Sequence, residues 1–399
     1  MKTIYLDNAA TTPVREEVLR VMLPYFSEEF GNPSALYPLG QRASDAVVAA
    51  RETIAQTIGA RSTDIYFTSG GSEADNWAIK GLARANADKR GRHIITSAIE
   101  HHAVLHTCQA LEKEGFEVTY LPVDERGLID PVVFEAAIRP DTVLASIMFA
   151  NNEIGTVEPI AELADIAHAH DVLFHTDAVQ AFGHEDIDVS RLGIDLMSAS
   201  AHKIYGPKGV GFLYVRRGVA IDNLIDGGGQ ERGRRATTEN VAGIVGFAEA
   251  ARLALAEREE QDRHMRHLRD HTIARILDEI PYSRLNGDAH ARLANNVNVS
   301  FEYIEGEGML LQMAFRGICV SSGSACTSGS LDPSHVLLAI GLPHEIAHGS
   351  MRLTLGRTTT LEEVDFAVDS LVGIITNLRA MSPLYEDFLR HGAPSLLAG

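Results

Sequence analysis

A lysine and an aspartate stand at the carboxyl ends of two neighbouring apolar runs. Asp177 follows the run 172–176, and Lys203 follows the run 196–200 in a loop of small residues. Lysines normally remain on surfaces, because burying an ammonium group is costly. A lysine in this setting favours a covalent Schiff-base role, with an ordinary surface lysine as the alternative.

The spacing of Asp177 and Lys203 corresponds to about one strand–helix–strand unit. A carboxylate at the end of a strand faces the crevice in which α/β proteins bind ligands. Pyridoxal phosphate needs both a Schiff-base lysine and an acid beside its ring nitrogen. The pair therefore predicts pyridoxal phosphate, whereas a lone aspartate would indicate a helix N-cap.

A phosphate group needs backbone N–H donors, and the segment 69–73 (Ser-Gly-Gly-Ser-Glu) offers them where a strand gives way to a helix. Gly71 and Ser72 let an anion approach the helix N-terminus. The same segment also matches a capping box, which is the alternative interpretation. The segment 206–211 does not match the glycine pattern of dinucleotide-binding proteins.

Other polar residues follow strands at comparable places. His101 could stack on a planar ring and move protons, while Asn152 and Gln180 offer amides to a ring hydroxyl. A zinc site at His101 and His102 is disfavoured, because adjacent residues rarely bind one ion and no cysteine pair lies nearby. Turn and capping roles are the alternatives for the two amides.

Three cysteines differ in their surroundings. Cys326 lies in the Gly- and Ser-rich segment 320–330, where we expect an exposed, mobile loop and a reactive thiol. Cys108 and Cys319 lie in apolar surroundings and are predicted to be core residues. Arg352 could bind a carboxylate through its forked guanidinium, with a surface salt bridge as the alternative.

The elements that must position these residues alternate between strands and helices. Seven β-rich runs are recognised: 65–68, 93–97, 117–121, 143–148, 172–176, 196–200 and 210–215. Several are apolar on successive residues, which is typical of strands covered on both faces. We predict a mostly parallel seven-stranded sheet flanked by helices, a long helix over about 241–280, and a smaller α+β domain. Within the long helix, His264, His267 and His271 lie on one face. They could form a metal site, but a polar, solvent-exposed surface is the simpler interpretation.

The composition of the chain argues against several classes of function and location. The 399 residues carry 35 Lys and Arg against 54 Asp and Glu, for a net charge of −19 that opposes nucleic-acid binding. Three cysteines give no disulfide framework, which indicates a reducing, cytoplasmic compartment. The N-terminus shows no signal peptide, and no apolar run is long enough for a membrane helix.

The chain resembles cysteine desulfurases of the NifS/IscS type, within the aspartate-aminotransferase-like class of pyridoxal-phosphate enzymes (fold type I). The motifs that carry this resemblance are 5–13, 30–34, 67–73, 151–156, 175–180, 200–203, 228–235 and 321–330. The long Ser-Ser-Gly-Ser-Ala-Cys-Thr-Ser segment matches the first group of that family. The resemblance implies a large cofactor-binding domain over 14–256, and a small domain over 1–13 and 257–399 that carries the cysteine loop.

The resemblance also implies the roles of individual residues. Lys203 would bind the cofactor covalently, Asp177 would pair with its ring nitrogen, and His101 would stack on the ring. The other cofactor-binding residues would be Gly71, Ser72, Asn152, Gln180, Ser200 and His202, with Thr238 supplied by the partner subunit of a homodimer. Arg352, with Asn152, would hold the substrate carboxylate, and Cys326 would take the sulfur as a persulfide.

The implied reaction converts L-cysteine to L-alanine and passes sulfur to an iron–sulfur scaffold protein. The resting enzyme would hold no metal, with Cys326 available as a transient ligand of an iron–sulfur cluster. Two alternatives remain at this point. One is a selenocysteine lyase or a transaminase on the same scaffold, and the other is a non-catalytic partner of iron–sulfur assembly. No nucleic-acid or membrane partner is expected.

Overall fold

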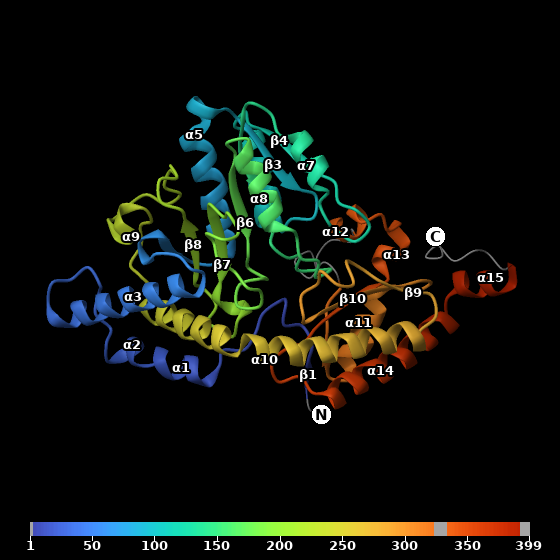
Figure 1. Ribbon diagram of the computed structural model, residues 1–399. Coiled ribbons are helices and arrows are strands. Elements are labelled where there is room, and N and C mark those ends of the chain that lie inside the picture. The colour runs from blue at the N-terminus through green and yellow to red at the C-terminus, as the bar shows by residue number, and fades with distance from the viewer. Residues whose placement is uncertain (1–2, 323–332, 392–399) are drawn as a thin grey trace.

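The computed structural model describes residues 3–322 and 333–391, and its centre is a seven-stranded sheet in the order β2-β8-β7-β6-β5-β3-β4 (Figure 1). The strands are β2 (Ile65–Thr68), β3 (His93–Ser97), β4 (Glu117–Leu121), β5 (Thr142–Ser146), β6 (Leu173–Asp177), β7 (Leu196–Ser200) and β8 (Gly211–Val215). Only β8 runs against its neighbours. The predicted seven strands and their mostly parallel arrangement are confirmed, four strands with the predicted bounds and three with ends shifted by one or two residues.

The strand directions bring the predicted polar residues to one edge. β3, β5, β6 and β7 are parallel, and β2 points the same way because β8 is antiparallel to both β2 and β7. The carboxyl ends of these five strands therefore meet at the same edge of the sheet, where α/β folds bind ligands.

Each face of the sheet is covered by its own hydrophobic core. Ile95, Phe174 and Phe212 point to one face, while the adjacent Ile94, Leu173 and Leu213 point to the other. The first core includes residues of α1 (Glu16–Met22), α3 (Pro38–Thr57), α7 (Pro131–Ala137), α8 (Ile160–Ala169) and α10 (Val241–Glu279). The second includes residues of α4 (Gly71–Asn76), a π-helical turn (Trp77–Gly81), α5 (Leu82–Arg90) and α6 (His102–Glu112). Strands buried on both sides explain the continuous apolar runs in the sequence.

A second group of elements forms around a smaller sheet. The antiparallel order β12-β10-β9 joins Ser350–Thr354, Asn296–Phe301 and Ser283–Leu285, and a parallel pair joins β1 (Ile4–Tyr5) to β11 (Ile318–Cys319). The helices here are α11 (Gly306–Phe315), α12 (His335–Ala339), α13 (His344–His348), α14 (Leu361–Ala380) and α15 (Pro383–His391). Of the remaining short helices, α9 (Gln230–Gly233) lies beside the large sheet, and α2 (Pro24–Ser27) packs on α1 and α10. The predicted α+β unit is present, with a hydrophobic core of its own.

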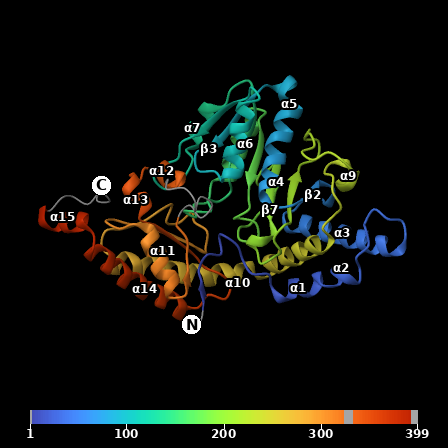
Figure 2. The same cartoon turned by 180° about the vertical axis from the view of Figure 1, so that it is seen from behind.

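The 39-residue helix α10 passes beneath both groups, and the view from behind shows the same arrangement (Figure 2). Its first half packs on α3, and its second half packs on α14. The predicted boundary near residue 256 would fall inside this helix, and that boundary stays a prediction. No helix within 3–322 and 333–391 is long and apolar enough to cross a membrane.

Candidate active site

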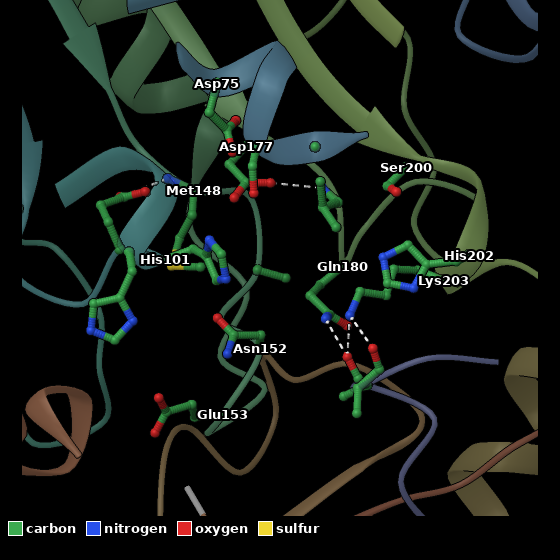
Figure 3. A pocket seen from close by; sticks show the side chains of 18 of the residues that line it. Asp75, His101, Met148, Asn152, Glu153, Asp177, Gln180, Ser200, His202 and Lys203 are labelled. Atoms are coloured by element: carbon green, nitrogen blue, oxygen red, sulfur yellow. Dashed lines mark hydrogen bonds between the residues drawn. The ribbon is translucent and has the colours of Figure 1, made fainter. Parts of the chain in front are cut away.

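A cavity of about 390 Å³ opens at the carboxyl edge of the large sheet. The predicted site residues that line it are Gly71, Ser72, His101, Asn152, Asp177, Gln180, Ser200, His202, Lys203 and Arg352 (Figure 3). Thr238 lines a different, smaller cavity of about 150 Å³, together with Ser69. Cys326 lies outside the described residues.

Lys203 is held by the N-terminal segment of the chain. It ends a 3₁₀ turn (Ala201–Lys203) that follows β7. Its Nζ donates hydrogen bonds to the carbonyl oxygens of Ala9 and Ala10, the second at 2.8 Å. Gln180 Nε2 donates to the same Ala9 oxygen at 3.1 Å. The amine therefore points into the cavity from a fixed position, on contacts that a bound ligand can replace.

Asp177 ends β6 and lies across the cavity from the lysine loop (Figure 3). The backbone N–H of Val179 donates to its Oδ1 at 2.9 Å. Burial raises the pKa of Asp177 to about 6, opposed by this hydrogen bond and by the charge of Lys203. The carboxylate is therefore ionised near neutral pH but weakly solvated, which suits a partner for a cationic ring nitrogen.

Two histidines in the cavity are neutral near pH 7. His101 is the N-cap of α6, and its Nδ1 accepts the backbone N–H of Ala103 at 3.1 Å. Burial, with the charge of Lys203, lowers the pKa of His101 to about 4. Because Nδ1 accepts, the neutral ring carries its proton on Nε2. Burial likewise lowers the pKa of His202 to about 4, and its Nδ1 lies 3.2 Å from the Thr11 hydroxyl.

The predicted phosphate cradle lies where β2 turns into α4. Gly70 has φ +153°, which side chains rarely adopt, and a Cβ on Gly71 would lie 2.5 Å from Val179. The first N–H groups of a helix lack partners within the helix, and they open here onto the cavity. Glu73 accepts the N–H of Ser69 at 2.8 Å, but no side chain caps the helix start, so the capping box is only half formed.

Arg352 connects the small sheet to the large one. Its guanidinium donates to the carbonyl oxygen of Asn152 at 2.8 Å and to Asp7 Oδ1 at 2.9 Å. The side chain is 3% exposed, so the alternative of a surface salt bridge is wrong. Its Nε has no partner among the described residues. The arginine therefore retains a buried donor that a ligand carboxylate could use.

The sequence interpretation missed several acids and their partners in the same cavity wall. Asp75 and Glu100 are buried, and each has one oxygen without a hydrogen bond among the described residues. Glu153 accepts the Ser334 hydroxyl, and burial raises its pKa to about 7. The only sequence signal was position, since Glu100 and Glu153 each directly neighbour a predicted site residue.

The remaining cysteines and histidines separate clearly. Cys108 is fully buried, and burial raises the pKa of its thiol to about 12, so its core assignment is confirmed. Cys319 is only half-buried, so the core prediction was wrong there; among the described strands, β11 pairs with the short β1 alone. His271 pairs with Asp365 at 2.7 Å and His264 bonds the Thr359 carbonyl at 3.0 Å. No cluster that could bind a metal occurs in the described part of the chain.

Comparison with known proteins identifies the family. The model of the class-V aminotransferases matches residues 4–366, so the chain belongs to this family of pyridoxal-phosphate enzymes. A cysteine desulfurase IscS of Methanosarcina thermophila is 59% identical, covering 96% of this chain and 94% of the relative. A cysteine desulfurase IscS of Clostridium botulinum is 56% identical, covering 98% of each. The resemblance inferred from the sequence is thereby confirmed.

Solved structures agree with the fold. A NifS-like protein, 39% identical, superposes with a TM-score of 0.89 over 94% of this chain and all of that chain. SspA in complex with cysteine, 42% identical, gives a TM-score of 0.79 over 90% of this chain and all of that one. The predicted aspartate-aminotransferase-like fold is confirmed.

The residues that line the cavity have the chemistry that pyridoxal phosphate requires, independently of the comparisons. Lys203 is the one lysine among the described residues that line it. Asp177 presents a buried carboxylate, and the glycine turn before Ser72 presents backbone donors. An amine, an acid and an anion cradle are the three groups that this cofactor requires.

Proposed function

We propose that this protein is a pyridoxal-phosphate-dependent cysteine desulfurase, which converts L-cysteine to L-alanine and passes the sulfur to an iron–sulfur scaffold protein. The observation that carries the proposal is the placement of Lys203, Asp177 and the Nε donor of Arg352 around one buried cavity. The names of the relatives at 59% and 56% identity, and the cysteine complex of SspA, support the same activity.

The proposed cofactor-binding site is formed by residues from several parts of the cavity lining. Lys203 would bind the aldehyde carbon, Asp177 would pair with the ring nitrogen, and His101 would contact the ring. Gly71, Ser72, Ser200 and His202 would hold the phosphate group, and Asn152 and Gln180 would hold the ring oxygen; all of these residues line the cavity. When bound, pyridoxal phosphate supplies a carbonyl carbon that reacts with amines and a ring that withdraws electrons.

The chain itself binds the substrate and moves its protons. Arg352 orients the carboxylate of cysteine through Nε, helped by the amide of Asn152. Lys203 Nζ would be the base that removes the Cα proton of cysteine. His101, neutral and protonated on Nε2, is placed to give a proton to a reacting atom and to take it back.

The sulfur is transferred to Cys326, which lies outside the described residues. In this step the Cys326 thiolate attacks the sulfur of cysteine. An S–S bond forms as the substrate C–S bond breaks, and the electron pair of that bond remains with the substrate. After protonation the substrate leaves as alanine, and Cys326 is left as a persulfide. The thiolate is the reactive form of a cysteine in such exchanges.

The homodimer and the cytoplasmic location belong to the same proposal. Thr238 lines a small cavity apart from Lys203 in its own subunit, which is compatible with a role at the cofactor phosphate of a partner subunit. The low cysteine content and the buried, reduced Cys108 favour a reducing compartment. Sedimentation of the active protein as a monomer of about 43 kDa would contradict the dimer.

The direct experiment uses the purified protein. A yellow preparation should change its visible absorbance when cysteine is added. With a thiol reductant present, which releases the persulfide sulfur as sulfide and is itself oxidised to a disulfide, alanine and sulfide should appear in equal amounts. A transaminase would instead consume an added keto acid and form no sulfide. A non-catalytic scaffold would give neither product. Selenocysteine should also react, because its chemistry at the same atoms is close to that of cysteine.

A further inference from the structure

A second buried aspartate lies behind Asp177, and the proposed mechanism leaves it without a role. Asp75 lies in α4, is 1% exposed, and lines the same cavity. Figure 3 shows its side chain directed toward Asp177. Its Oδ1 accepts no hydrogen bond from the described residues. A buried, unpartnered carboxylate oxygen would be costly, whereas the carbonyl oxygen of a neutral acid tolerates the position better.

The described groups that face Asp75 offer no compensating charge. His175 Nε2 lies 3.8 Å from Asp75 Oδ1, but burial lowers the pKa of His175 to about 3, so this ring is neutral. The other titratable neighbours are Asp177 and Glu100, which are both acids. Burial, reinforced by these two carboxyls, raises the pKa of Asp75 well above its ordinary value.

The hydrogen bonds around Asp75 accommodate a proton. The Ser198 hydroxyl interacts with the Asp75 carboxyl, and this contact opposes the rise in the pKa of Asp75 without cancelling it. The same hydroxyl lies 3.0 Å from His175 Nε2 and so connects the acid to the ring. On the other side of that ring, His175 Nδ1 lies 2.8 Å from the Ser146 hydroxyl. If Asp75 donates to Ser198, then Ser198 donates to His175 Nε2, and His175 Nδ1–H donates to Ser146. In this arrangement Asp75, Ser198 and His175 each donate to the next group.

We propose that Asp75 is a positioning residue that retains a proton beside Asp177 and thereby confines the negative charge of the pair to Asp177. Two adjacent carboxyls in a dry site do not both ionise. Asp177 is the better site for the charge, because it accepts the Val179 N–H at 2.9 Å and faces Lys203. The role of Asp177 toward the ring nitrogen rests on the proposed function, whereas the protonation of Asp75 does not.

Infrared spectroscopy of the purified protein at neutral pH tests the protonation directly. The wild type minus Asp75→Asn difference should show a carboxylic-acid C=O band and no carboxylate band. Asp288→Asn is the matched control, because Asp288 is also buried but accepts the backbone N–H groups of His290 and Ala291 at 2.7 Å each. That difference should show carboxylate bands. Carboxylate bands in the Asp75 difference would overturn the proposal.

The ring nitrogen of ¹⁵N-labelled pyridoxal phosphate tests which carboxyl carries the charge. Its NMR shift should report a protonated nitrogen in the wild type and in Asp75→Asn, and an unprotonated nitrogen in Asp177→Asn. The reverse pattern would place the charge on Asp75 and overturn the proposal. A wild-type protein that binds no cofactor would instead refute the proposed function, and the infrared result would still stand.

Stability gives a third measurement that does not need the cofactor site to be active. Unfolded Asp75 releases its proton at about pH 4, but the folded acid releases it at higher pH. The wild type should therefore lose stability relative to Asp75→Asn as the pH rises between about 5 and 8. A difference in Tm that stays constant over this range would contradict the proposal. Should Asp75→Asn not fold, the wild type with ¹³C-labelled aspartate can be titrated by infrared in its place.

Discussion

Arg352 and Asn152 lie 200 residues apart in the sequence and are joined by a hydrogen bond of 2.8 Å, from the guanidinium to the backbone carbonyl. Arg352 belongs to the small antiparallel sheet, whereas Asn152 follows β5 of the large sheet. The second contact of the guanidinium, to Asp7, adds the N-terminal segment. Three distant parts of the chain therefore fix the orientation of one arginine at the cavity.

Replacing Arg352 by lysine should raise the KM for cysteine by about 10- to 100-fold and change kcat less. A lysine ammonium retains the charge but loses the planar fork that contacts Asn152 and Asp7 while leaving Nε for a ligand. Hydrogen bonds to charged groups contribute about 1.5–3 kcal/mol, which corresponds to this range. Steady-state kinetics with cysteine measures the effect. Arg20→Lys, at an exposed arginine, is the control, and an equal effect there would contradict the assignment.

Lys203→Ala should give a folded protein that does not turn over cysteine. The change removes the one lysine among the described residues that line the cavity, and with it both the covalent attachment and the base. Activity and the visible spectrum are the measurements, with Lys208→Ala as the control, because that exposed lysine lies outside the cavity. Normal desulfurase activity in Lys203→Ala would rule out the proposed mechanism.

His101→Gln should lower kcat by about 10²- to 10⁴-fold, the usual contribution of a positioned proton donor. A glutamine side chain can still accept the Ala103 N–H, so the start of α6 should remain capped. The cofactor should still bind, which its absorbance will show. The folded histidine becomes protonated only near pH 4, so the wild-type rate should show no inflection near pH 6.5 from this residue. Such an inflection, absent in His101→Gln, would show that His101 is charged at neutral pH.

Glu158→Gln should stabilise the protein above neutral pH. Glu158 is buried, accepts the Ile129 N–H at 3.1 Å, and has a second oxygen without a partner among the described residues. Burial raises the pKa of Glu158 to about 8, so the folded state retains a proton that the unfolded chain loses near pH 4. Stability is therefore lost as the pH rises toward 8, and glutamine removes this loss. Urea unfolding at about pH 6 and about pH 8.5 measures it, with an expected gain on the order of 1 kcal/mol or more at the higher pH.

The sequence predicted the residues that follow strands and missed those that are defined by packing. Asp177, Lys203 and His101 were found because each lies at, or within four residues after, the carboxyl end of an apolar run, and parallel strands bring such ends together. Asp75 lies inside a helix, and nothing in its neighbours signals that the residue meets Asp177. Burial of an acid is a tertiary property, so its protonation could not be predicted from the chain.

Two local features depend on residues that are distant in the sequence. The helical stretch between β2 and β3 contains a π-helical turn at Trp77–Gly81. There the Trp77 ring N–H donates to the Asp222 carbonyl at 2.9 Å, and a Cβ on Gly81 would lie 2.6 Å from the same oxygen. Cys319 was expected in the core because its neighbours are apolar, but β11 has only the short β1 as partner within the described residues.

Cys326→Ser should separate cofactor chemistry from sulfur transfer. Lys203 and Asp177 are unchanged in this variant, so added cysteine should still shift the visible absorbance. A serine hydroxyl does not ionise near neutral pH and cannot accept the sulfur, so steady production of alanine should stop. Rapid-scanning absorbance and alanine assays on the same preparation measure the two parts. Continued alanine production would show that Cys326 is not the sulfur acceptor.

The other two thiols are the internal controls for this prediction, and they differ from each other. Cys108 is fully buried with a thiol pKa raised to about 12, so Cys108→Ser should affect only stability. Cys319 is half-buried and thus the more demanding control, since a half-exposed thiol could collect sulfur by itself. Mass spectrometry after a short incubation with cysteine should find one added sulfur, on the peptide that contains Cys326. The same sulfur on Cys319 would mean that the Gly- and Ser-rich surroundings of Cys326 do not decide which thiol reacts.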